Sequence, residues 1–431
     1  MSLLVLEDES VEYAFLTLVL DGGSSDDPTG KGGLHSLLGN TLTCGAGHRD
    51  RVAFQEALDR IGGDCTLRTG RRHTFLEAEV LSRNVEPMLA LLTDLLNDPR
   101  FEQSELETQQ RIADAELSQV RDSDEELVAF LHGQFVWQGH VYGRSVRGDS
   151  QSVRGIERED VVEAWAKVRE RGLILLGASG HIQEDTLNNW SSEAVKLPSA
   201  DPKRDVPNAL SSNSWSGVEV QIIDRRDRNQ AQIMWGQPSC NALHDDLYAL
   251  RVANTAFGGT FTSTLMQEIR EKRGWTYGAY SAIAADLTTG VFSMSYHVEN
   301  ANAFSAIELG YDLFKEWRGN GLSGEDMMKA KSYIVNSFPF TLETSQKRLE
   351  RELTMFMLGR SADYLENYVS RIEAVSEEEI RGALSRHLSG DKMRLTVLGN
   401  ASELGPALEA ADWVNSVIVR PYDEPISEFL R

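Results

Sequence analysis

Two segments of the sequence hold side chains whose types could do chemistry. Residues 30–45 contain His35 in a glycine-rich stretch that leads into a helical leucine pattern, and residues 248–281 contain Arg270 and Tyr277. A phenol hydroxyl can stabilise negative charge that develops on an oxygen, and a guanidinium can bind groups that accept hydrogen bonds. His35 has no second histidine four residues later, so the first segment lacks an imidazole pair that could bind metal on one helix face.

The helices and strands that must position these segments are predicted by a sequence pattern that occurs twice along the chain. A helical pattern over residues 156–168 leads to an apolar run at 173–180, and a similar pattern over residues 375–387 leads to an apolar run at 395–401. The second pair follows the first by about half of the chain length. This repeat predicts two related halves.

The boundary between the halves is predicted in a segment rich in proline, serine and charge. We expect an amino-terminal half at residues 1–200, a linker at 201–214 and a carboxy-terminal half at 215–431. Within each half, β-branched, strand-like runs alternate with longer helical patterns. The strand-like runs include residues 15–20 and 218–223, and the helical patterns include residues 85–96 and 303–317. The alternation lacks a strict strand–helix–strand rhythm, which predicts an α+β fold with helices packed on a mixed, mainly antiparallel sheet.

The composition excludes several classes of protein. The 431 residues carry 43 Lys and Arg against 66 Asp and Glu, a formal charge of -23, so neither nucleic acid nor anionic lipid is an expected partner. No apolar run approaches the roughly 18 residues of a membrane helix. The three cysteines are far apart, which argues against a disulfide framework or a thiolate zinc site. The strand-like residues 3–6 would fit a chain trimmed of a natural leader.

The first segment resembles the inverted zinc-motif helix of the pitrilysin-type metallopeptidases, the family of mitochondrial processing peptidase. In that pattern, Gly-Leu-Ala-His-x-x-Glu-His, two histidines bind zinc and the glutamate is the general base. The alignment on Gly33 and the leucines places Ser36 at the first histidine, Gly39 at the glutamate and Asn40 at the second histidine. These three residues supply neither a competent ligand set nor a base. The resemblance therefore implies no metal in this chain.

The third zinc ligand of the family is a glutamate further along the chain, and Glu116 stands at that position. The supporting glutamate two helical turns earlier is replaced by Gln109. One carboxylate cannot hold zinc. We interpret Glu116 as a leftover of the ligand set and an ordinary acid on a helix surface.

The second segment tracks the carboxy-terminal signature of the same family. In active relatives, an Arg and a Tyr seven residues apart reach the zinc site of the amino-terminal half, and Arg270 and Tyr277 have this separation. The resemblance implies that these two act catalytically in trans, and that Gly258, Gly259 and Ser263 bind substrate. Two alternatives stay open at this point. Arg270 could end a surface helix with Tyr277 packed beneath it, and the glycine pair could be a helix C-cap.

The resemblance implies two homologous α/β-layered halves of the LuxS/MPP-like metallohydrolase type. It also implies a bacterial chain that is inactive alone and serves as the zinc-free subunit of a heterodimeric metalloendopeptidase. The partner would be a homologous zinc-binding subunit, with zinc in the partner and an unfolded peptide as substrate. A homodimer of the isolated chain is the other pairing. The alternative functions are a purely structural subunit and a peptide-binding subunit, and the compartment, cytoplasm or periplasm, stays open.

Overall fold

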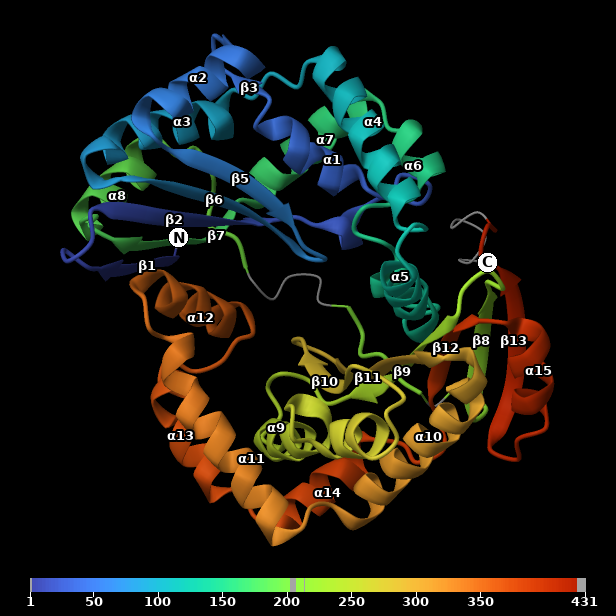
Figure 1. The fold of residues 1–431 in the computed structure, drawn as a ribbon. Coiled ribbons are helices and arrows are strands. Elements are labelled where there is room, and N and C mark those ends of the chain that lie inside the picture. The colour runs from blue at the N-terminus through green and yellow to red at the C-terminus, as the bar shows by residue number, and fades with distance from the viewer. Residues whose placement is uncertain (1, 202–206, 213, 425–431) are drawn as a thin grey trace. The chain divides into compact units, whose positions relative to one another are not determined.

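The computed structural model describes residues 2–201, 207–212 and 214–424, which form two compact units (Figure 1). Unit 1 comprises Met1–Gln119, Arg144–Asp205 and Thr341–Met357, and unit 2 comprises Val120–Gly143, Val206–Phe340 and Leu358–Arg431. Each unit thus takes one short segment from the opposite half of the sequence. The predicted linker at 201–214 includes residues 202–206 and 213, which lie outside the described residues. The boundaries 1–200 and 215–431 stay a prediction.

Unit 1 is built on a five-stranded sheet. Its strands, in spatial order, are β1 (Ser2–Glu7), β7 (Leu173–Gly180), β2 (Tyr13–Asp21), β6 (His73–Leu81) and β5 (Asp64–Thr69). Strands β1 and β7 pair in parallel, and the other neighbours pair antiparallel. The sheet is therefore mixed and mainly antiparallel, as the sequence predicts.

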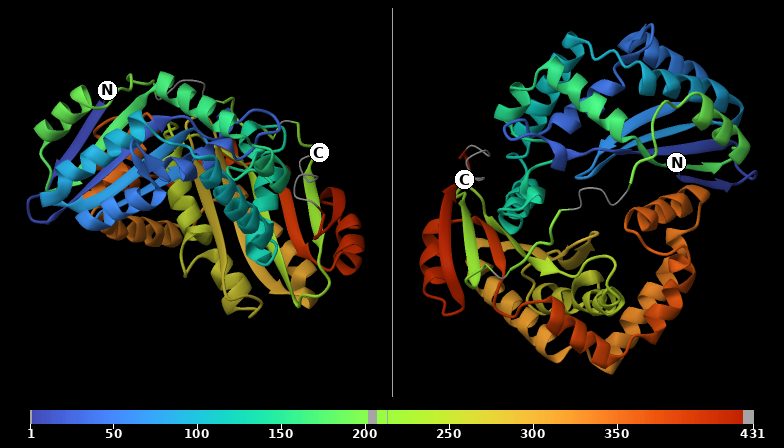
Figure 2. Two further views of the ribbon diagram at one scale, coloured as in Figure 1. Left: turned by 90° about the horizontal axis from the view of Figure 1, so that it is seen from above. Right: turned by 180° about the vertical axis from the view of Figure 1, so that it is seen from behind.

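Helices cover both faces of this sheet. Most belong to the amino-terminal half: α1 (Leu34–Leu42), α2 (Arg51–Ile61), α3 (Val85–Asn97), α4 (Gln103–Gln119), α6 (Ser150–Arg154), α7 (Arg158–Arg171) and α8 (Glu184–Glu193). Helices α1, α3 and α7 lie on one face of the sheet, and α12 (Ser345–Met357) covers the opposite face (Figures 1 and 2). Helix α12 comes from the second half of the sequence. Leu349 and Leu353 of α12 pack on Phe15, Val19 and Leu175.

Unit 2 is built on a six-stranded sheet. Its strands, in spatial order, are β10 (Ala279–Ala285), β11 (Gly290–Glu299), β9 (Gln230–Ser239), β12 (Arg394–Gly399), β8 (Val218–Asp224) and β13 (Val414–Pro421). The pairs β12–β8 and β8–β13 are parallel and the others are antiparallel. This sheet is also mixed and mainly antiparallel.

The helices of unit 2 again come mostly from its own half. They are α9 (Asp246–Asn254), α10 (Ala303–Asn320), α11 (Gly324–Ser337), α13 (Tyr364–Ala374), α14 (Glu377–His387) and α15 (Ala401–Glu409). The exception is α5 (Asp124–Val136), from the first half of the sequence. Leu127, Val128 and Leu131 of α5 pack against Ile223 and Leu398 of the sheet.

The two sheets repeat one strand order, which confirms the predicted repeat. The two spatial orders correspond strand by strand: β1, β7, β2, β6 and β5 of the first sheet match β8, β12, β9, β11 and β10 of the second. In both sheets the first pair of this order is parallel. The predicted helix–strand pairs are α7 with β7 and α14 with β12. The exchanged helices α5 and α12 cover the sheet of the opposite half in the same way. Within the described residues, no helix combines the length and the apolar composition needed to cross a bilayer.

This correspondence places the two chemically interesting segments at equivalent positions. In unit 1, α1 lies in the connection between β2 and β5, and in unit 2, α9 lies in the connection between β9 and β10. Arg270 and Tyr277 belong to the second connection, which also contains the π-helical turns η4 (Thr255–Gly259) and η5 (Met266–Glu271). The two connections can therefore be compared directly.

Candidate functional site

Helix α1 carries the three positions at which the family pattern has its zinc ligands and base. Leu34, Leu37, Leu38 and Leu42 are buried, which confirms the apolar face that the leucine spacing predicts. The amino end of the helix is held by Asp27, whose carboxylate oxygens accept hydrogen bonds from the backbone N–H groups of Gly33 (2.8 Å) and His35 (3.0 Å). These bonds satisfy two donors that the first turn of a helix leaves without a partner.

The imidazole of His35 is engaged in this same contact. Its Nδ1 lies 2.7 Å from Asp27 Oδ1, and both side chains are almost fully buried. The opposite edge of the ring faces Gly22, where an added Cβ would lie 3.5 Å from His35 Nε2. His35 therefore holds α1 against the preceding loop.

The positions of the family's zinc ligands and base have different surroundings. Ser36 is half-buried and Asn40 is exposed, whereas Gly39 is buried against the edge strand β5. An added Cβ at position 39 would lie 3.0 Å from Thr69 Oγ1 on β5, closer than ordinary van der Waals contact. Thr69 Oγ1 is itself held in place because it donates a hydrogen bond to the backbone carbonyl of His35 (3.0 Å). Strand β5 therefore packs where a glutamate side chain would begin.

The remaining positions of the family pattern lie on or next to α4. Gln109 Nε2 is 3.7 Å from Cys44 Sγ, just beyond the end of α1, and the Cys44 thiol donates to the backbone carbonyl of Asn40 (3.2 Å). Burial, together with the nearby carboxylate of Glu105, raises the pKa of the Cys44 thiol, so it stays protonated near neutral pH. Glu116 is exposed two helical turns after Gln109. The structure thus brings Gln109, not a carboxylate, to the end of α1.

In unit 2, the glycine pair lies in the first π-helical turn of the second connection. Gly258 is buried so tightly that an added Cβ would lie 2.4 Å from Ser281 Oγ on β10, and Gly259 is exposed at the end of the turn. Ser263 is buried, and its Oγ has no hydrogen-bond partner in the described part of the chain. Packing against β10 is therefore one physical reason for the glycine at 258. The substrate-binding role predicted for these three residues stays a prediction.

Arg270 ends up beside an aromatic side chain. Its guanidinium carbon lies 4.2 Å from the centroid of the Phe261 ring, and Phe261 is itself 59% exposed. Nη1 lies 3.3 Å from Glu271 Oε1 without hydrogen-bond geometry, and no other residue of the described chain accepts from it. Two neighbouring cations behave differently, because Lys272 (2.5 Å) and Arg273 (2.9 Å) both bind the carboxylate of Glu268. Arg270 is therefore left with hydrogen-bonding capacity.

Tyr277 lies in the loop between η5 and β10. Its side chain is 82% exposed, which is exceptional for a tyrosine because burial of the ring is favourable. The alternative in which Tyr277 packs beneath the Arg270 helix is therefore wrong. The Tyr277 phenol is therefore available to a molecule outside this unit, whereas the Arg270 side chain is only 30% exposed and its Nη1 is buried.

Three residues that matter for these sites were missed in the sequence. Asp27 and Thr69 hold α1 and β5, and Phe261 supports Arg270. Asp27 and Thr69 gave no signal, because their partners lie 8 and 34 residues away along the chain. Phe261 lies two residues after the glycine pair in a polar segment, and an aromatic residue at such a place could have been noticed.

Comparison with known families covers both halves of the chain. Residues 3–150 match the model of insulinase, peptidase family M16, and residues 155–334 match the model described as the peptidase M16 inactive domain. The two matched regions contain α1 and the Arg270–Tyr277 segment respectively.

Relatives and solved structures agree with this family. An uncharacterized zinc protease of Streptomyces coelicolor is 22% identical over 90% of this chain and 85% of its own length. The non-peptidase homolog YmxG of Helicobacter pylori is 22% identical over 91% of this chain and 90% of its own length. The crystal structure of a peptidase M16 inactive domain from Pseudomonas fluorescens superposes with a TM-score of 0.83 at 22% identity, covering 92% of this chain and 95% of that one.

Proposed function

The chain belongs to the peptidase M16 family, and we propose that it acts as the subunit without the catalytic zinc site in a two-chain metalloendopeptidase. In this proposal, a homologous partner subunit supplies zinc and the general base. This chain supplies Arg270 and Tyr277 to the reaction. Neither chain would hydrolyse peptides efficiently alone.

The composition and packing of α1 support the first part of the proposal. Ser36, Gly39 and Asn40 replace two imidazoles and a carboxylate, and generating a hydroxide at neutral pH in this family needs zinc held by such ligands. A glutamate at position 39 would start 3.0 Å from Thr69 Oγ1. The position of the family's general base is therefore closely packed against β5 in this chain.

The residues of the β9–β10 connection support the second part of the proposal, that this chain supplies Arg270 and Tyr277 to the reaction. Hydrolysis passes through a tetrahedral intermediate with a negative oxygen, and one well-placed donor to that oxygen lowers the barrier by roughly 3 to 4 kcal/mol. The Tyr277 hydroxyl is such a donor. The planar Arg270 guanidinium is suited to binding peptide carbonyl groups, because its N–H donors lie in a fixed fork.

The observation that carries the proposal is the 82% exposure of Tyr277, seven residues after Arg270 in the same connection. A purely structural role gives a protein no reason to keep a large aromatic ring in water, or to leave the buried Nη1 of Arg270 without a hydrogen-bond partner. The exposed Tyr277 ring would be covered when another molecule binds. A partner subunit with a bound peptide would cover it.

The expected substrate is an unfolded peptide bound through its backbone. An extended peptide that adds a strand to a sheet edge of the partner would be recognised mainly by main-chain hydrogen bonds, so side-chain selectivity would be loose. The charge of -23 would favour basic peptides in the initial encounter.

The test is to mix the purified chain with an M16 chain that carries His-x-x-Glu-His, preferably one encoded beside it. An internally quenched peptide reports hydrolysis. The proposal predicts chelator-sensitive hydrolysis in the mixture that far exceeds that of either chain. A stable mixed complex without any gain in hydrolysis would instead favour a purely structural subunit. Peptide binding by self-paired chains without a mixed complex would favour a peptide-binding homodimer.

A further inference from the structure

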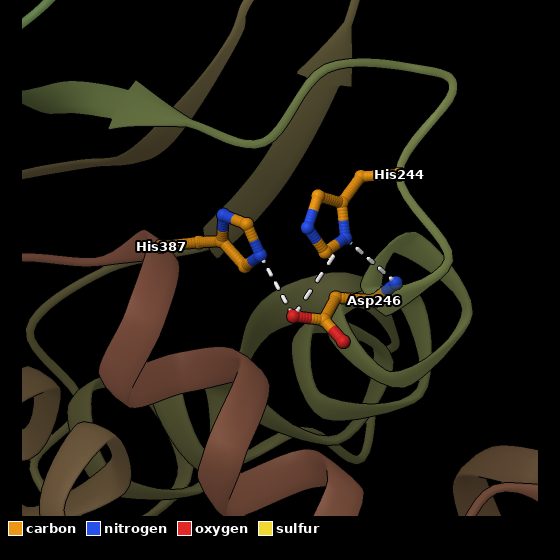
Figure 3. Close-up of side chains that lie close together, drawn as sticks. All are labelled: His244, Asp246 and His387. Atoms are coloured by element: carbon orange, nitrogen blue, oxygen red, sulfur yellow. Dashed lines mark hydrogen bonds and ion pairs between the residues drawn. The ribbon is translucent and has the colours of Figure 1, made fainter.

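A second group of chemically capable side chains lies in unit 2, outside the Arg270–Tyr277 segment. His244 stands just before α9, Asp246 is the first residue of α9, and His387 is the last residue of α14 (Figure 3). Their potential ligand atoms all lie within 4.8 Å of one another. In the described part of the chain, no other group of three His, Cys, Asp or Glu side chains converges in this way.

The distances are close to those of a metal site. His387 Nε2 lies 2.8 Å from Asp246 Oδ2, and His244 Nδ1 lies 3.7 Å from the same oxygen. Ligands of a tetrahedral zinc ion lie about 2.0 to 2.2 Å from the metal and therefore about 3.3 Å from each other. Both rings face the carboxylate in Figure 3. The two distances to Asp246 Oδ2 are thus within about half an ångström of this value, and the third distance, between the two imidazoles, is at most 4.8 Å.

The freedom of the side chains permits shifts of this size. His244 is exposed at 43% of its side-chain surface, and its Nδ1 accepts only the backbone N–H of Asp246 (3.1 Å), which water can replace. His387 is more enclosed, and its ring stands edge-on to His244 with the centroids 4.4 Å apart.

One neighbouring group competes with a metal ion for the carboxylate. Arg386 binds Asp246 in a bidentate manner, with Nε 2.8 Å from Oδ2 and Nη2 2.9 Å from Oδ1. A divalent ion next to this guanidinium is disfavoured by charge repulsion. Arg386 is, however, more than half exposed, so it can turn into water when an ion binds.

We propose that His244, Asp246 and His387 form a binding site for a divalent transition-metal ion such as Zn²⁺. Two imidazoles and one carboxylate are a common ligand set for zinc, and the exposed side of the group leaves a coordination position for water. The ion joins the end of α14 to the start of α9. Since α9 leads into η4 and η5, a bound ion would fix the base of the segment that carries Arg270.

The proposal is tested by zinc titration of the full chain after it has been stripped with a chelator. Competition with a chromophoric chelator gives the affinity, and elemental analysis gives the stoichiometry. We expect one Zn²⁺ per chain, a visible absorption band when Co²⁺ replaces it, and a higher Tm with zinc present. Failure of the wild-type chain to bind either ion would overturn the proposal.

The variant His244→Ala is the sharpest one, because this exposed side chain contributes little to the fold. It is expected to weaken zinc binding by at least about tenfold, and His387→Ala should do the same. The control His181→Ala changes an exposed histidine of unit 1 and should leave binding intact. Retention of one zinc at unchanged affinity in His244→Ala would refute the assignment of the ligands.

Arg386 provides an independent check of the site. Because the positive guanidinium repels a divalent cation and competes with it for Asp246, Arg386→Gln is expected to tighten zinc binding by about tenfold. Weaker or unchanged binding would contradict the geometry described here. These measurements use the chain alone, so their outcome is separate from the peptidase test with a partner.

Discussion

The connection from β2 to β5 in unit 1 and the connection from β9 to β10 in unit 2 occupy the same place in a repeated fold but differ in their packing. In the first, a threonine of the edge strand packs on Gly39 and a buried aspartate holds His35. In the second, Tyr277 is 82% exposed and Arg270 is only partly engaged. The comparison teaches that the two connections do different work. The β2–β5 connection is closed by packing and is called the consolidated copy below. The β9–β10 connection exposes Tyr277 to a molecule outside it and is called the open copy.

The largest effect is expected for Asp27→Ala in the consolidated copy. The substitution leaves His35 Nδ1 and two backbone N–H groups buried without their acceptor, which should reduce the free energy of unfolding by about 3 to 5 kcal/mol. Urea denaturation measures the change. The control Asp50→Ala removes an exposed N-cap from α2 and should cost only about 1 kcal/mol. Equal costs for the two variants would contradict the structural role of Asp27.

The next effect concerns the open copy. With a zinc-motif partner present, Tyr277→Phe should lower kcat by roughly 100- to 1,000-fold, because the oxyanion loses its phenol donor. Its Tm should not change, since the side chain is 82% exposed. Tyr280→Phe is the matched control, as this tyrosine is 49% exposed three residues later. Comparable rates for the wild type and Tyr277→Phe would remove the role assigned to this residue.

A smaller effect is expected for Arg270→Lys. The substitution keeps the charge but loses the planar fork of donors, and kcat/KM for a peptide should fall about 10- to 100-fold through poorer positioning. Arg273→Lys is the control, because Arg273 is bound to Glu268 and not free to contact a peptide. If both variants behaved alike in the mixed assay, Arg270 would have no special function.

The smallest effect tests the packing of the consolidated copy. In an open helix, Gly→Ala stabilises by about 1 kcal/mol, but at position 39 the new Cβ would meet Thr69 Oγ1 at 3.0 Å. Gly39→Ala should therefore give its full stabilisation only in a chain that also carries Thr69→Ala. Urea denaturation of the four chains measures this coupling. Equal effects of Gly39→Ala in both backgrounds would show that β5 does not constrain the position.

Much of the fold could be predicted from the sequence. The leucine spacing of residues 34–42 predicted the buried face of α1, and the repeated helix–strand pattern around Gly177 and Gly399 predicted two similar sheets. These features follow from local periodicity. The exchange of α5 and α12 was not predicted, because an apolar helix face does not specify which of two similar sheets will cover it.

The candidate site was predictable only where a family motif covered it. The motif identified Ser36, Gly39, Asn40, Arg270 and Tyr277, but the exposure of Tyr277 required coordinates. The contact between His244 and His387 had no signal in the sequence, since 143 residues separate them and each histidine alone is unremarkable. Long-range convergence of side chains depends on the topology.

The central claim is that this chain can stabilise an oxyanion but, with Ser36, Gly39 and Asn40 on α1, lacks the groups that generate the attacking hydroxide in this family. The most direct measurement is hydrolysis of an internally quenched peptide by the isolated chain, purified free of other peptidases and supplied with excess Zn²⁺, with and without a chelator. We predict the same background rate in both conditions, for the wild type and for His244→Ala. Hydrolysis by the isolated chain that the chelator abolishes would contradict the account.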